Sequence, residues 1–164
     1  MKMLNARWIY FSLIAVCLLT GCTKAKAPPL NVQVPDQLIL YSIDPGVMGP
    51  GRPPVTEGDE LFHGYSVLGK IDVASAEDRR MLMTEYEAGK SKQPPKACFN
   101  PRHGIRTIHQ DKTTDYLICF ECNQSYIYTG DAKSGSDIIT ESAQGTFNKH
   151  LTDAGIPLAQ PPAQ

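Results

Sequence analysis

The chain has 164 residues, with 16 lysines and arginines against 17 aspartates and glutamates, and a formal net charge of −1 at pH 7. This balance, without any basic run, argues against nucleic acid as a partner. No repeat with a period of 20 to 50 residues is visible, which argues against a solenoid.

The first 21 residues are predicted to be a lipoprotein signal peptide. A basic start precedes the apolar run WIYFSLIAVCLL at residues 8–19, which is too short to span a membrane comfortably. The LTGC that follows, residues 19–22, resembles the lipobox of bacterial lipoproteins. This resemblance implies cleavage before Cys22 and attachment of lipid to it. An ordinary secretory signal and an uncleaved anchor are the alternatives.

Lipid on Cys22 would make the membrane a partner of this chain, because several acyl chains give stable anchoring. Residues 22–35 are polar and contain prolines, so we expect a tether there. The expected location is the bacterial cell envelope. Thr23, rather than aspartate, follows the cysteine, and by the family's sorting rule this favours the periplasmic face of the outer membrane if the cell is Gram-negative.

Residues 36–157 are predicted to form a single α+β domain, and residues 158–164 a disordered tail. Strand-like and helix-like segments follow one another without βαβ alternation, so we expect a small, mainly antiparallel sheet with two helices. A long Pro/Gly-rich loop is expected at residues 45–60. The expected strands are residues 37–44, 64–73, 103–109, 115–128 and 136–141, and the expected helices are residues 75–90 and 142–155.

The first helix has clear end signals. Ser75 is a good N-cap, and Gly89 suits a left-handed C-cap. The spacing of Met81, Leu82 and Tyr86 predicts that all three face the core.

The second half of the chain reads as a hairpin with a five-residue loop, QDKTT, at residues 110–114. In that hairpin, position 103 lies opposite position 121 or 122.

Three cysteines remain beyond Cys22 in the predicted mature chain: Cys98, Cys119 and Cys122. An oxidising compartment favours a disulfide from Cys98 to either of the others, with the third cysteine buried as a small apolar residue. Cys119 and Cys122 lie in a run that reads as one strand, where residues i and i+3 point to opposite faces. The two could then bond each other only across a local bulge.

Two further hypotheses use the same residues. Cys98, His103, Cys119 and Cys122 have the spacing C-x4-H-x15-C-x2-C and offer a complete tetrahedral ligand set, so Zn²⁺ is the one cofactor considered. Alternatively, Cys119 and Cys122 form a thiol-redox pair. Intermolecular pairing, or three reduced thiols, also remains open.

Charged residues flank this group. Arg102, His103 and Arg106 could bind an anion near the NPRHG turn. We favour the simpler prediction that Arg102 or Arg106 pairs with Glu121 across the hairpin.

The segments ACFNPRHGIR, residues 97–106, and YLICFEC, residues 116–122, resemble the paired signature of a group of small bacterial proteins. That signature reads C-[FY]-x-P-R-H-G-[IV], followed by [IV]-C-F-E-C. The resemblance implies a shared core but no particular activity. It also implies that one site contains the residues Cys98, Arg102, His103, Cys119, Glu121 and Cys122.

The sequence contains no G-x-S-x-G, P-loop, G-x-G-x-x-G or H-E-x-x-H motif. We therefore expect a lipid-anchored, non-enzymatic binding or interaction domain with a structural Cys/His hairpin. An unknown protein partner remains open.

Overall fold

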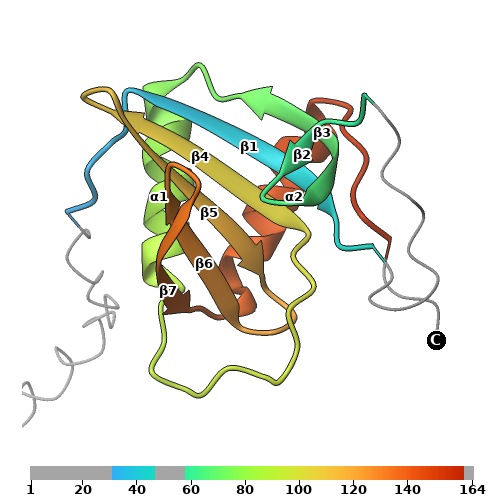
Figure 1. The fold of residues 1–164 in the computed structure, drawn as a ribbon. Helices are drawn as coiled ribbons and strands as arrows, with labels where there is room; N and C mark the ends of the chain where they lie inside the picture. The colour runs from blue at the N-terminus through green and yellow to red at the C-terminus, as the bar shows by residue number, and fades with distance from the viewer. Residues whose placement is uncertain (1–30, 47–57, 161–164) are drawn as a thin grey trace, which may run out of the picture.

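The computed structural model describes residues 31–46 and 58–160 (Figure 1). The predicted signal peptide, Cys22, most of the tether, residues 47–57 of the predicted long loop and residues 161–164 lie outside the described residues. In the part of the chain that is described, no helix is both long enough and apolar enough to cross a membrane.

The predicted α+β fold is confirmed. Seven strands form one antiparallel sheet in the order β2-β3-β1-β4-β5-β6-β7. The elements are β1 Gln37–Asp44, β2 Leu61–Phe62, β3 Tyr65–Asp72, α1 Ala76–Ala88, β4 His103–His109, β5 Lys112–Cys119, β6 Gln124–Thr129, β7 Ala132–Ile138, the 3-10 turn η1 Glu141–Ala143 and α2 Gln144–Asp153.

Alternate residues of the strands build two separate cores, because successive side chains in a strand point to opposite faces. Both helices lie on the same face of the sheet and form the larger core with it (Figure 1). Leu40 and Ile118 from the sheet meet Leu82 of α1 and Phe147 of α2 in this core. The opposite face, called the open face below, carries a smaller core of Tyr41, Ile43, Phe62 and Leu117.

The β2–β3 hairpin folds over the open face and packs on β4. A Cβ placed at Gly104 would lie only 2.8 Å from the ring of Phe62 and 2.8 Å from Ile43 Cδ1. Only a residue without a side chain leaves room for Phe62, which is 2% exposed. Gly104 therefore lets the hairpin lie close to the sheet.

The predicted hairpin loop is wrong in length. Gln110 and Asp111 alone connect β4 to β5, with φ angles of 47° and 64°. Two central residues with positive φ make a tight turn that matches the twist of the strands. As a result His103 pairs with Ile118, and not with position 121 or 122.

The predicted strand 115–128 is two strands, β5 and β6, separated by a turn at residues 120–123. Asn123 adopts φ 56° there, a conformation that asparagine tolerates. The following strand, β7, covers residues 132–138 rather than 136–141.

The first helix begins as predicted: Ser75 Oγ accepts a hydrogen bond from the Asp78 N–H at 3.3 Å. Leu82 and Tyr86 are buried as predicted. Met81 is 38% exposed, however, and Met83 takes its place in the core. The left-handed cap is also wrong, because Gly89 has φ −74° and continues the right-handed helical turn.

Candidate functional site

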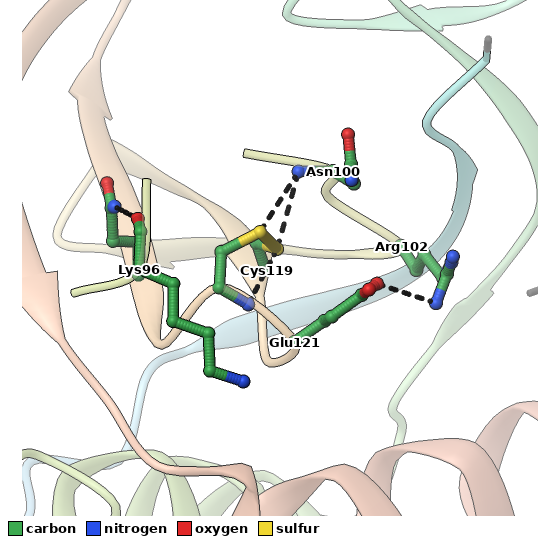
Figure 2. The surroundings of a disulfide bond; sticks show 7 residues. Lys96, Asn100, Arg102, Cys119 and Glu121 are labelled. Carbon is green, nitrogen blue, oxygen red and sulfur yellow. Dashed lines mark hydrogen bonds and ion pairs between the residues drawn. A yellow bond between two sulfur atoms is a disulfide. The ribbon is translucent and has the colours of Figure 1, made fainter. Parts of the chain in front are cut away.

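Cys119 and Cys122 form a disulfide across the turn between β5 and β6, with their Cα atoms 5.3 Å apart (Figure 2). The opposite-face argument fails here because residues 119–122 are not one straight strand. A turn brings positions i and i+3 together, whereas a strand separates them. Both cysteines are buried, at 1% and 0% exposure.

Cys98 is a free, half-buried thiol, so the predicted bridge from it is not the one that the structure forms. The segment around it nevertheless lies over the disulfide turn. The Lys96 N–H donates to the Cys122 carbonyl at 3.0 Å, and Gln124 Nε2 donates to the Lys96 carbonyl at 3.0 Å. The Asn100 N–H lies 3.4 Å from both disulfide sulfurs (Figure 2).

His103 does not join the cysteines. It lies on the helix face of the sheet beside Ile118, whereas Cys119 is the next residue along β5 and points to the open face. The four residues of the predicted zinc set therefore do not converge. Across residues 31–46 and 58–160, no group of three or more His, Cys, Asp or Glu side chains is placed to hold a metal ion.

His103 is instead packed under α2. Its side chain is 3% exposed, and Nε2 donates to Asn148 Oδ1 at 2.7 Å, since a carboxamide oxygen can only accept. The rings of Phe120 and Phe147 lie edge-on to it. Burial lowers the pKa of His103 to about 4, against the opposing effect of the Asn148 hydrogen bond. The imidazole is therefore neutral at pH 7.

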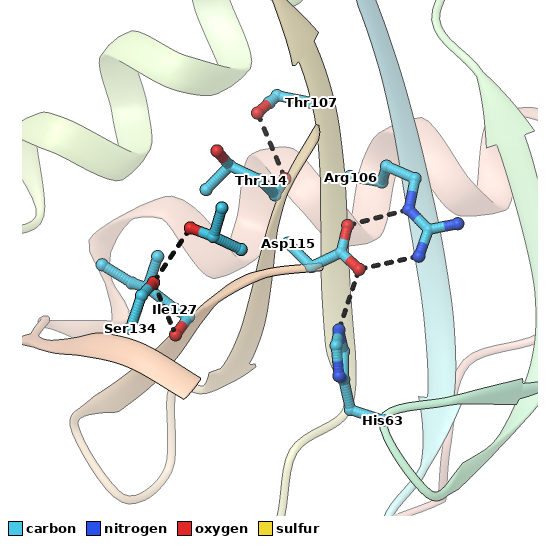
Figure 3. A network of polar contacts seen from close by, with 8 residues as sticks. His63, Arg106, Thr107, Thr114, Asp115, Ile127 and Ser134 are labelled. Carbon is cyan, nitrogen blue, oxygen red and sulfur yellow. Dashed lines mark hydrogen bonds and ion pairs between the residues drawn. The ribbon is translucent and has the colours of Figure 1, made fainter. Parts of the chain in front are cut away.

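The predicted pairing of Arg102 with Glu121 is confirmed, with Nη1 and Oε2 3.3 Å apart (Figure 2). Arg106 pairs with Asp115 instead. Its Nε and Nη2 donate to the two carboxylate oxygens at 2.8 and 2.7 Å. His63 Nε2 also lies 2.8 Å from Asp115 Oδ2 (Figure 3).

Sequence analysis did not single out Asp115 or His63. Asp115 is 2% exposed in the middle of a strand, where a buried carboxylate requires partners. Its partner Arg106 lies directly opposite it in the sheet. Only the correct hairpin register would have revealed that pair.

Two of the pockets in the described part of the chain lie close to the predicted residues or to the hairpin. One, of about 500 Å³, lies between α1, the β4–β5 hairpin and residues 31–35, and its lining includes Glu87, His109 and Lys112. The other, of about 300 Å³, is called the Arg102 pocket. It is lined by Arg102, His103, Gln144, Asn148, Leu158, Ala159 and Gln160.

The Arg102 pocket includes part of the predicted tail. Leu158 packs against the main core, and residues 158–160 form one wall of the pocket. No protein-family model, curated protein or solved structure matches this chain.

Proposed function

We propose that this chain is a lipid-anchored domain of the bacterial cell envelope that binds a small ligand bearing a carboxylate and catalyses no reaction. The observation that carries the proposal is the Arg102 pocket, which combines one permanent cation with three neutral carboxamides, those of Gln144, Asn148 and Gln160. Two of its lining residues, Arg102 and His103, belong to the NPRHG turn for which sequence analysis considered anion binding.

The lining of the Arg102 pocket favours an anion over a cation. Among the described residues that line it, Arg102 is charged and none is a carboxylate. The guanidinium carries five donors and can hold a carboxylate with two of them. Glu121, its partner in the fold, is half exposed and 3.3 Å away, so this ion pair is weak and leaves donors for a ligand.

Among the described residues, the side chains that could take part in catalysis are already occupied within the fold. His103 is buried, neutral and bonded to Asn148. Asp115 accepts from Arg106 and pairs with His63. Both bridge sulfurs are buried. Groups held in closed pairings of this kind stabilise a fold and are poorly placed to exchange protons or electrons with a substrate.

Binding is tested by NMR titration of the ¹⁵N-labelled full chain in detergent micelles. N-acetylglycine is the probe, and N-acetylglycinamide is its uncharged control. We expect the side-chain amide signals of Gln144 and Asn148 to shift, with affinity for the acid at least about tenfold above that for the amide. Arg102→Gln should remove this preference. Arg80→Gln, at an exposed arginine of α1, should leave it intact. Equal binding of acid and amide would contradict the proposal.

The anchor is tested separately by feeding producing cells an alkyne-tagged fatty acid. The full chain should carry the tag and sediment with membranes, and Cys22→Ala should lose the tag. Labelling that persists in Cys22→Ala would refute attachment at this residue.

A thiol-redox function is the second candidate, because the Cys119–Cys122 bridge does exist in the structure. A redox-active bridge should be half reduced in a glutathione buffer with a potential near about −200 mV. A structural bridge has a reduction potential below about −300 mV and should stay oxidised in that buffer. Titration of the full chain against such buffers decides between the two.

A further inference from the structure

We propose that Cys98 and the Cys119–Cys122 bridge form one thiol-exchange site. In this site the Cys98 thiolate attacks Cys122 Sγ and releases Cys119, which gives a Cys98–Cys122 bridge. The three cysteines do not line the Arg102 pocket, which adjoins their turn through the Arg102–Glu121 ion pair, and the exchange does not depend on ligand binding in that pocket.

Hydrogen bonds on both sides of Cys98 fix it near the bridge. Lys96, two residues before it, is bonded to Cys122, and Asn100, two residues after it, contacts both sulfurs at 3.4 Å. Standard chain dimensions put Cys98 Cα within about 6 Å of the Asn100 nitrogen, and so within about 10 Å of either sulfur.

A new bridge needs the two Cα atoms to be about 4.4 to 6.8 Å apart. Because about 10 Å is the upper limit of the distance from Cys98 Cα to either sulfur, a movement of a few ångströms is enough to reach this range. Residues 92–97, which lead into Cys98, are all exposed and can take up this movement. Phe99, which follows Cys98, stacks on Tyr126 beside the smaller core and keeps the other side of the segment in place.

The hydrogen bonds also predict which sulfur leaves. Cys119 Sγ accepts from the Cys122 N–H at 3.2 Å and from the Asn100 N–H at 3.4 Å. For Cys122 Sγ the structure gives the Asn100 N–H. Backbone donors stabilise a thiolate, and the better stabilised thiolate is the better leaving group. Cys119 therefore departs, and Cys122 is the sulfur attacked.

The exchange balances without an oxidant or a reductant. One S–S bond forms between Cys98 and Cys122, and the bond between Cys119 and Cys122 breaks. Cys98 gives its proton to solvent, and the Cys119 thiolate takes one up. Before exchange the free thiol is that of Cys98, in a half-buried loop. After exchange it is that of Cys119, at the end of β5 and 1% exposed. Exchange would hide the thiol from large partners.

Peptide mapping of the full chain reads out the pairing. Cleavage after lysine, arginine and glutamate separates Cys98 in residues 97–102, Cys119 in residues 113–121 and Cys122 in residues 122–133. The sample is held at pH 8 without added thiol, quenched with acid, alkylated and mapped. Wild type should give the 97–102/122–133 linkage at about 1% or more of total, and Cys98→Ser should give none.

Two variants test the direction, each incubated with glutathione disulfide as the oxidant, which is reduced to two glutathione thiols as the protein bridge forms. Cys119→Ser should form a Cys98–Cys122 bridge nearly completely, and Cys122→Ser should form a Cys98–Cys119 bridge several-fold less. Free Cys98 and Cys122 thiols in Cys119→Ser would overturn the proposal, provided that its circular dichroism matches wild type. If that variant does not fold, the wild-type map decides: a linkage below about 1% overturns the proposal.

Discussion

Replacing Gly104 with alanine should destabilise the domain by about 1 to 3 kcal/mol, the usual cost of forcing one extra methyl group into a filled core. The new Cβ would lie 2.8 Å from Phe62 Cε1 and 2.8 Å from Ile43 Cδ1. Both neighbours are almost fully buried, at 2% and 0% exposure, so neither can swing away into solvent. The β2–β3 hairpin must lift from the sheet instead.

Urea unfolding and thermal melts of the full chain in detergent measure this cost. A loss of 1 to 3 kcal/mol corresponds to a melting temperature lower by roughly 3 to 12 °C. Gly145→Ala is the matched control, because it adds the same methyl group in α2, where no atom beyond its own helical backbone and chain neighbours lies within 4 Å. Alanine in an open helix position should stabilise by about 0.5 to 1 kcal/mol.

A double-mutant cycle isolates the contact with Phe62. Phe62→Ala removes the ring, so the cost of Gly104→Ala should fall by at least half in that background. Two results would refute this reasoning: a Gly104→Ala stability within about 0.5 kcal/mol of wild type, or a cost that is the same with and without the ring.

Two further predictions concern buried charge and ionisation. A folded-state pKa of about 4 for His103, below the ordinary 6.5, means that the unfolded chain takes up this proton first as the pH falls. The contribution of His103 to stability is therefore full above about pH 6.5 and declines towards pH 4 by about 3 kcal/mol. Urea unfolding measures this decline as the difference in unfolding free energy between wild type and His103→Gln at each pH. Asp115→Asn strips Arg106 and His63 of their carboxylate and should cost about 2 to 4 kcal/mol, less than a fully buried pair because Arg106 is 39% exposed. Asp131→Asn, at an exposed turn, should stay within about 0.5 kcal/mol of wild type in the same measurement.

The start of the first helix was predicted correctly because it depends on interactions between residues that are close in the sequence. Ser75 caps its helix because its hydroxyl meets a free backbone N–H whatever the rest of the fold does. The Met81 prediction failed because the helical stripe is rotated by contacts with the sheet. Burial of Met83 instead places α1 over β4 and β5, which helical spacing alone does not determine.

The position of His103 relative to the cysteines was mispredicted because of the length of one turn. A five-residue loop in place of the two residues Gln110 and Asp111 moves the partner of His103 from Ile118 to position 121 or 122. A three-residue error in register exchanges the two faces of a strand, so it would place Cys119 on the face of His103. The sequence offered no glycine at this turn to reveal its length.

The turn at residues 120–123 was hidden for a different reason. The turn follows the apolar end of β5 directly, and neither proline nor glycine occurs between β5 and β6. What closes the turn is the Cys119–Cys122 bridge together with the positive φ of Asn123. The bridge is a covalent constraint that strand propensity does not reveal, and it acts together with one ordinary turn residue, Asn123.

These corrections also explain why the residues of the PRHG segment occur together. Arg102 pairs with Glu121 of the disulfide turn, His103 bonds to Asn148 of α2, and Gly104 leaves room for Phe62. Three consecutive residues thus hold three different elements against one strand end. A segment with that role needs specific residue types for packing alone. The residue types at positions 102–104 are therefore accounted for by packing, and the argument for a ligand rests on the Arg102 pocket beside them.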